Sequence, residues 1–213
     1  MGNDILQQLG QSGVVSIIRG IPEAAACQTV SALRAGGIGA VEITMDTPAA
    51  LRMIERVKTE FGAELTVGAG TVLDPETARA VILAGADFVL SPTLSRPVIE
   101  VCNRYSKLAV PGVLTPTEIL TAWEAGARLV KVFPARAFGP EYIKDVKGPL
   151  SQVEIMPVGG VDLDNAATYI RSGAHSLGVG GQLVNISRVR EGRFEEITKT
   201  AAEFVKRVAA ARV

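Results

Sequence analysis

The chain has 213 residues, 47% of them apolar, and its 22 acidic and 22 basic side chains give no net charge at pH 7. This length suits one domain with a large core, and the lack of a basic excess argues against a general nucleic-acid-binding protein. A single histidine and two cysteines far apart in the chain exclude a zinc site made of clustered Cys and His ligands.

Short apolar runs alternate with longer amphipathic stretches along the whole chain. We predict strands at Val14–Ile18, Ala40–Thr44, Thr66–Ala69, Phe88–Ser91, Leu108–Pro111, Leu129–Phe133, Glu154–Val158 and Ser176–Val179. We predict helices at Glu23–Ala35, Pro48–Phe61, Pro75–Ala84, Pro97–Tyr105, Pro116–Ala125, Asn165–Ser172 and Phe194–Arg212. Such alternation indicates parallel βαβ units. At about 27 residues per unit, a small (β/α)8 TIM barrel fits, formed by residues 1–213 as a single domain. A doubly wound open sheet is the alternative.

Glycines and capping residues mark the ends of the predicted helices. Four glycines, each expected in the left-handed conformation that ends a helix, precede every second strand: Gly37, Gly85, Gly126 and Gly173. Three pairs place a capping side chain before a proline at the first helical position: Thr47-Pro48, Asp74-Pro75 and Thr115-Pro116. The repeat every two βα units favours a barrel over an open sheet.

Lys131 is the most unusual residue of the predicted strands. It lies in the middle of the apolar segment Leu129–Phe133, and strand alternation places it on the inner face if the two flanking valines face the helices. Removal from water favours the uncharged amine of a lysine, which can attack a ketone and form a Schiff base. The alternative is a lysine that extends from the strand end into water, as we expect for the other six lysines.

Glu42 and Arg19 are the next charged residues of the predicted barrel. Glu42 lies inside the second strand, where a carboxylate can act as a general acid and base near the amine. It can equally form an internal salt bridge, and the two roles are compatible. Arg19 ends the first strand, where a cation can bind a carboxylate or phosphate, or neutralise Glu42.

The ends of other strands carry a hydroxyl and two glycine pairs. Thr71 follows the third strand, in a Gly-Ala-Gly-Thr sequence that lacks the third glycine of a dinucleotide fingerprint. Backbone N–H groups after strands seven and eight form the phosphate site common in this fold, and glycine pairs stand there: Gly159, Gly160, Gly180 and Gly181. His175 precedes the eighth strand and is therefore expected at the opposite face, away from the chemistry.

Two further expectations concern the protein's environment. No run of 18 uncharged apolar residues occurs, so we expect no membrane-spanning segment. The N-terminal sequence MGNDILQQLG has neither a basic region nor an apolar run, so we expect no secretory signal and a cytoplasmic protein. The two cysteines, which fall in helical patterns, are expected to be reduced packing residues.

The chain resembles the bacterial class I aldolases for 2-keto-3-deoxy-6-phosphogluconate and 4-hydroxy-2-oxoglutarate. The motifs that carry the resemblance are VEIT at 41–44, GAGTVL at 68–73, SPT at 91–93, PGVLTPTE at 111–118, LVKVFPA at 129–135, FGPEYIK at 138–144 and MPVGGV at 156–161. Some segments are also similar to the branch that acts on the galactonate epimer. The family implies a (β/α)8 barrel, a Schiff-base lysine, no metal, no cofactor and a homotrimer.

Carried over by position, the resemblance implies that Lys131 is the Schiff-base lysine and Glu42 the acid–base carboxylate. Thr71 would contact the pyruvyl carboxylate, Pro92 and Phe133 would form pocket walls, and the glycine pairs would bind phosphate. The expected substrate-binding residues are Arg19, Thr44, Thr71, Pro92, Phe133, Gly159, Gly160, Gly180, Gly181 and Gln182. Many relatives have a carboxylate-binding arginine four residues after the glutamate, where this chain has Asp46.

These residues predict cleavage of a 2-keto-3-deoxy-6-phospho sugar acid or of 4-hydroxy-2-oxoglutarate to pyruvate and an aldehyde. The only expected partners are this small 2-keto acid and further copies of the chain. One alternative is a phosphate-binding barrel that performs isomerase or synthase chemistry without an imine. Another is a sugar-phosphate-binding protein that has lost catalysis.

Overall fold

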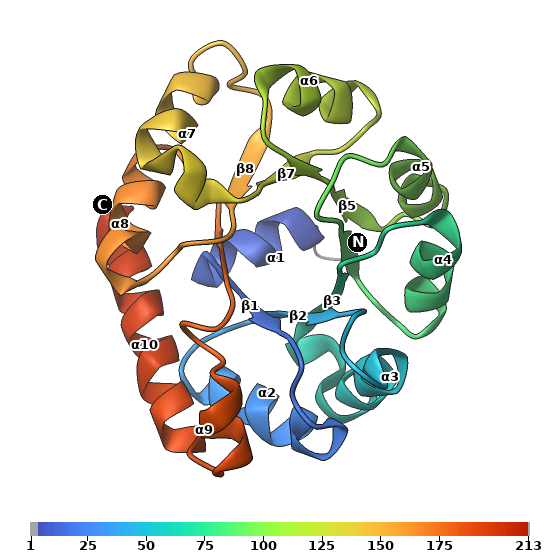
Figure 1. The fold of residues 1–213 in the computed structure, drawn as a ribbon, viewed down its shortest axis with the longest axis vertical. Helices are drawn as coiled ribbons and strands as arrows, with labels where there is room; N and C mark the ends of the chain where they lie inside the picture. The colour runs from blue at the N-terminus through green and yellow to red at the C-terminus, as the bar shows by residue number, and fades with distance from the viewer. Residues whose placement is uncertain (1–3, 213) are drawn as a thin grey trace.

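The computed structural model describes residues 4–212, in which parallel strands alternate with helices (Figure 1). The strands are β1 (Val14–Ile18), β2 (Ala40–Thr44), β3 (Thr66–Gly70), β4 (Phe88–Leu90), β5 (Leu108–Val110), β6 (Gly112–Val113), β7 (Leu129–Val132), β8 (Glu154–Pro157) and β9 (Leu177–Val179). The α-helices are α1 (Ile5–Ser12), α2 (Ala26–Ala35), α3 (Ala50–Phe61), α4 (Pro75–Leu83), α5 (Arg96–Arg104), α6 (Pro116–Glu124), α7 (Gly139–Lys147), α8 (Leu163–Arg171), α9 (Ile186–Arg190) and α10 (Phe194–Ala211). Three 3-10 turns lie at Glu23–Ala25, Gly62–Glu64 and Ala135–Ala137.

The strands form a curled parallel sheet in two hydrogen-bonded parts. One part has the order β5-β4-β3-β2-β1-β9 and the other β6-β7-β8. The parts approach each other at both ends. Only Pro111 separates β5 from β6, and a parallel bridge joins Val158, just after β8, to Gly178 of β9. In Figure 1 the strands surround the centre of the molecule, α1 is seen in the middle of this ring, and the other helices lie outside the strands.

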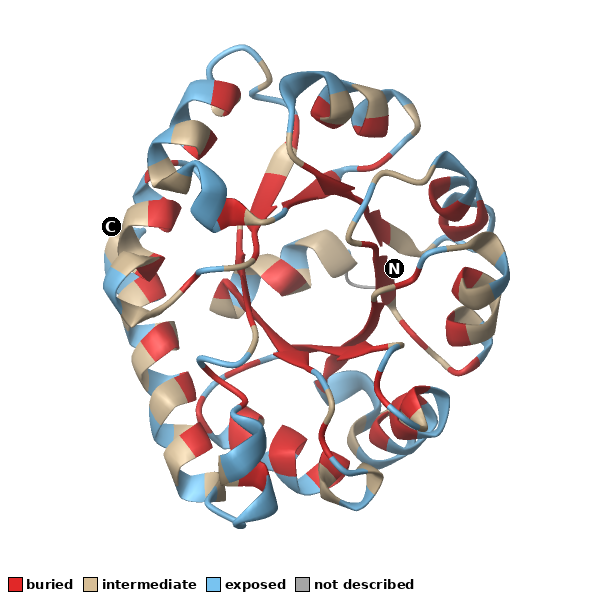
Figure 2. Ribbon diagram, in the orientation of Figure 1, coloured by how far each residue is buried: buried red, intermediate tan, exposed pale blue. Residues whose placement is uncertain are grey.

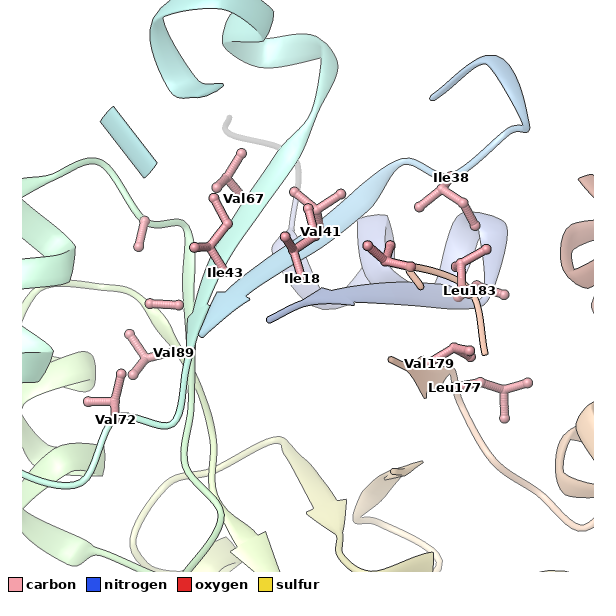
Figure 3. Close-up of a cluster of buried hydrophobic side chains, with 14 of the residues drawn as sticks. Ile18, Ile38, Val41, Ile43, Val67, Val72, Val89, Leu177, Val179 and Leu183 are labelled. Carbon is pink, nitrogen blue, oxygen red and sulfur yellow. The ribbon is translucent and has the colours of Figure 1, made fainter. Parts of the chain in front are cut away.

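The alternation of side chains along the strands divides the core into two layers. Val41, Ile43 and Val67 point outward and pack between the sheet and the helices, in the cluster of Figure 3. Phe88 and Leu129 belong to a separate inner cluster. Figure 2 shows that the strands are buried almost throughout, while the helices are buried only on the side that faces them. Charged residues on the inner strand faces therefore lie in the middle of the molecule.

Helix α1 covers the end of the inner layer where the strands begin. Its Leu9 is fully buried in the inner cluster, and Ile5 and Leu6 pack against that cluster. Residues 1–3, which open the N-terminal segment considered above for a secretory signal, lie outside the described residues. Because α1 closes the inner layer at this end, access to the inner layer is left at the carboxyl ends of the strands.

The positions of the strands agree closely with the predicted ranges. The four helix-ending glycines, Gly37, Gly85, Gly126 and Gly173, all have positive φ angles, between 89° and 99°. The fifth predicted strand, Leu108–Pro111, ends at Val110, since Pro111 has no N–H group for a ladder hydrogen bond, and the short strand β6 after it was not predicted. Among residues 4–212, the structure contains no helix with the length and apolar character needed to span a membrane.

Two of the three predicted helix caps are confirmed. Asp74 accepts a hydrogen bond from the Thr77 N–H at 2.6 Å, and Thr115 forms a capping box with Glu118. The prediction for Thr47 is wrong, because α3 begins only at Ala50. The Thr47 hydroxyl instead accepts a hydrogen bond from the N–H of Gly20, so a contact between two loops replaces the local cap.

Candidate active site

A cavity of about 220 Å³ opens at the carboxyl ends of the strands. Its lining includes the predicted residues Arg19, Thr71, Pro92, Lys131, Phe133, Gly159, Gly160, Gly180, Gly181 and Gln182. The sequence did not single out the other lining residues, which are Ile17, Val158, Val161 and Gly178. The loops after strands that are distant in sequence thus converge on one site.

Lys131 lies on the inner face of β7. Its flanking valines belong to the outer layer, as predicted, and the side chain is only 4% exposed. The Nζ atom lies 5.0 Å from the centre of the Phe133 ring, a distance at which a cation and an aromatic face attract. The amine is therefore shielded by protein but borders the cavity.

Glu42 is completely buried on the inner face of β2. Within residues 4–212, neither of its carboxylate oxygens has a hydrogen-bond partner. Burial raises the pKa of this carboxyl group; the charges of Lys131 and Arg19 oppose that effect, while Asp46 adds to it. A carboxyl group whose pKa is raised by burial, and whose charge interacts with Lys131, is suited to accept and return a proton.

Gly70 of β3 makes room for this carboxyl group. A Cβ atom at Gly70 would overlap Oε1 and Cδ of Glu42 and lie 2.7 Å from its Cγ. Sequence reasoning named this glycine only as part of the Gly-Ala-Gly-Thr segment. Its contact with Glu42 crosses between two strands, and no local pattern in the sequence indicates it.

Arg19 is held at the cavity rim by two partners. One guanidinium nitrogen forms an ion pair with Asp46, and the other donates to the Thr71 hydroxyl at 3.1 Å. Thr71 has a φ of +58°, which is unusual for a β-branched residue and is typical of functional sites. The pairing with Arg19 shows how this chain accommodates a carboxylate at position 46.

The glycine pairs border the other side of the cavity. Gly159 and Gly160 have φ angles of 87° and 92°, which side chains rarely adopt. In the described part of the chain, the N–H groups of Gly160, Gly180 and Gly181 donate to no other backbone carbonyl. Unpaired N–H groups clustered at a cavity wall are suited to bind an anion.

The sequence profile of the family described as "KDPG and KHG aldolase" matches residues 5–200. The chain belongs to this family. It is 36% identical to the 2-dehydro-3-deoxy-6-phosphogalactonate aldolase of Escherichia coli K12 over 91% of this chain and 93% of that one.

Two solved structures of the family are closely similar. The structure called "Native KDPGal structure" has a TM-score of 0.89 and 36% identity, over 93% of this chain and 95% of the other. The KDPG aldolase of Legionella pneumophila, with pyruvate captured as a covalent carbinolamine intermediate, has a TM-score of 0.88 and 27% identity. That match covers 95% of this chain and 98% of the other.

Two predicted site residues, Glu42 and Thr44, do not line the cavity. Thr44 lies on the same strand face as Glu42, but it is fully buried. Its hydroxyl is 3.0 Å from the hydroxyl of Thr47 and 3.4 Å from the carbonyl oxygen of Ile18. These protein contacts occupy the group that was expected to bind substrate, so the structure does not bring Thr44 together with the other site residues.

Larger hollows of the aldolase fold lie at the opposite end of the sheet. One is lined by Arg128 and Lys107, and another by His175 and Arg212. Neither contains Lys131 or Glu42, and His175 lies there as its sequence position predicted. Among residues 4–212, no group of three or more His, Cys, Asp or Glu side chains is arranged to hold a metal ion.

Proposed function

We propose that this protein is a class I aldolase that cleaves a 2-keto-4-hydroxy acid to pyruvate and an aldehyde. The proposed substrate is a 2-keto-3-deoxy-6-phospho sugar acid or 4-hydroxy-2-oxoglutarate, which yield glyceraldehyde 3-phosphate or glyoxylate. The observation that carries the proposal is the buried amine of Lys131 at the cavity wall, in the electrostatic field of the buried Glu42 carboxyl. The covalent carbinolamine of the Legionella relative supports an imine mechanism.

In the proposed mechanism, the uncharged amine of Lys131 attacks the C2 ketone and gives a carbinolamine. Loss of water forms a protonated imine. Glu42, directly or through a water molecule, takes the proton of the C4 hydroxyl, and the C3–C4 bond breaks. The electron pair of that bond passes to the imine and forms an enamine, while C4 becomes the carbonyl of the departing aldehyde. Protonation at C3 and hydrolysis release pyruvate and restore the amine.

The other cavity residues orient the substrate. We assign the carboxylate next to the ketone to Thr71 and the part of the substrate beyond the cleaved bond to Arg19, both of which offer hydrogen-bond donors at the rim. Pro92 and Phe133 form walls beside the imine. The glycine pairs and the Gln182 amide bind the phosphate through N–H donors: Gly159, Gly160, Gly180 and Gly181. The protonated imine supplies the electron sink, so the proposed reaction requires neither a metal ion nor a cofactor.

The same proposal extends to the architecture. We infer that the curled sheet is a complete (β/α)8 barrel, that residues 1–213 form one domain, and that the protein acts in the cytoplasm. We further infer a homotrimer. Large apolar side chains are exposed on or beside the consecutive helices α4, α5 and α6, at Leu83, Tyr105, Leu120 and Trp123, and they offer a surface for contacts between copies.

A substrate panel tests the proposed reaction. The assay follows pyruvate release from the gluconate and galactonate 6-phosphates of the 2-keto-3-deoxy acids, their unphosphorylated forms, and 4-hydroxy-2-oxoglutarate. We expect release from at least one of them, loss of release in Lys131→Ala, and unchanged release in Lys144→Ala, whose exposed side chain lies on α7. Pyruvate release by the Lys131→Ala protein would overturn the proposal. Binding of these compounds without release would favour a non-catalytic protein.

A further inference from the structure

The loop after β2 holds Arg19 from outside the cavity. Asp46 does not line the cavity; it faces an adjacent hollow formed by residues 45–52, and within residues 4–212 its carboxylate pairs with the guanidinium of Arg19 alone. Thr71 binds the same guanidinium from the cavity rim. Arg19 is thus held between a carboxylate of opposite charge and a hydroxyl.

The backbone keeps Asp46 in this place. The N–H of Met45 donates to the carbonyl of Gly70 at 2.8 Å, and the N–H of Thr47 donates to the carbonyl of Thr44 at 2.9 Å. The Thr47 hydroxyl also accepts from the N–H of Gly20, the residue that follows Arg19, at 2.9 Å. The two loops that carry Arg19 and Asp46 are therefore joined independently of the ion pair.

The charges of the cavity are few. Among its lining residues, Arg19 and Lys131 are the cations, and the remaining polar contacts are hydroxyl, amide and backbone groups. The negative charge of Asp46 also raises the pKa of the buried Glu42 carboxyl group, although burial and the opposing cations have larger effects. A substrate with a second carboxylate near the reacting carbons meets an arginine whose charge is already compensated.

We propose that Asp46 is a specificity-determining positioning residue, which holds Arg19 as a hydrogen-bond donor and disfavours substrates with a second carboxylate. The hydroxyl groups of a sugar acid need only hydrogen-bond donors from the protein. The second carboxylate of a dicarboxylate such as 4-hydroxy-2-oxoglutarate needs a cation that is not already paired with a protein carboxylate. This inference rests on the proposed aldolase function. It assigns the hydroxylated sugar acids as the preferred substrate class.

The test is a binding titration that does not require cleavage. Pyruvate carries one carboxylate; 2-oxoglutarate carries two and lacks the 4-hydroxyl group. We expect Asp46→Asn to tighten binding of 2-oxoglutarate by about five- to tenfold and to change that of pyruvate by less than about threefold. Asp46→Glu keeps the negative charge, so we expect it to retain the ratio of pyruvate affinity to 2-oxoglutarate affinity that the wild type has.

The matched control is Glu64→Gln. It removes one carboxylate from another ion pair, that with Arg34, just before β3 and thus at the opposite end of the strands. This control should leave both affinities unchanged. Equal changes for the two ligands in Asp46→Asn, or no change, would overturn the proposal. If the Asp46→Asn variant does not fold, the proposal would be overturned by an Asp46→Glu variant that no longer discriminates between pyruvate and 2-oxoglutarate. Failure of the aldolase function would appear separately, as absence of pyruvate release from the whole panel by the wild type.

Discussion

Replacement of Gly70 by alanine tests whether Glu42 takes part in the reaction. The new methyl group would overlap two atoms of the Glu42 carboxyl group and lie 2.7 Å from Cγ, so the whole group must move, not only its tip. A displacement of about 1 Å of a catalytic group costs on the order of 100-fold in rate, and loss of a positioned base costs about 10² to 10⁴. We therefore expect kcat of Gly70→Ala to fall at least about 100-fold.

The control for this variant lies two residues away on the same strand. A methyl group at Gly68 would overlap the Phe88 ring, with Cδ2 at 2.6 Å, and its three nearest atoms all belong to that ring. Overpacking costs about 1–3 kcal/mol in either variant. For a protein of this size that lowers Tm by roughly 2–12 °C. Steady-state kinetics and thermal unfolding of both variants separate the effects. Equal losses of kcat in Gly68→Ala and Gly70→Ala would refute the reasoning.

Two further predictions concern buried ionisable groups. Burial raises the pKa of Glu42, so the native state binds its proton more tightly than the unfolded state, and the free energy of unfolding falls as pH rises above the usual range of glutamate. Glu42→Gln should therefore gain Tm relative to the wild type between pH 5 and pH 8 while losing activity; a difference in Tm that stays constant with pH would contradict this. Burial also raises the pKa of Cys27 to about 11 and that of Cys102 to about 12. Neither thiol should react with a disulfide reagent at pH 8 until the protein is unfolded, and rapid labelling of the native protein would contradict the inference.

The strand period predicted which residues share the inner face of the sheet. Lys131 and Glu42 were identified because a charged residue inside an apolar strand is rare and alternation fixes its side. Alternation does not fix the depth of a residue along the strand or its hydrogen-bond partners. Thr44 therefore has the inner orientation of Glu42, yet its hydroxyl is occupied by Thr47.

Local sequence patterns did not predict the contacts that join different loops and different strands. The Thr-Pro sequence at Thr47 is typical of a helix cap, but the Thr47 hydroxyl instead accepts a hydrogen bond from the N–H of Gly20 in another loop. The space at Gly70 that admits Glu42 depends on the register of β2 against β3, in which Glu42 lies opposite Gly68 and Thr44 opposite Gly70. The pairing of Asp46 with Arg19 likewise joins loops 27 positions apart.

The most direct test of the central claim is reductive trapping of the imine. The protein is incubated with pyruvate and borohydride, and peptide mass mapping locates any adduct. We expect one adduct per chain on Lys131 in the wild type and in Lys144→Ala, and none in Lys131→Ala. An adduct in the Lys131→Ala protein, or none in a wild-type protein that releases pyruvate, would contradict the account.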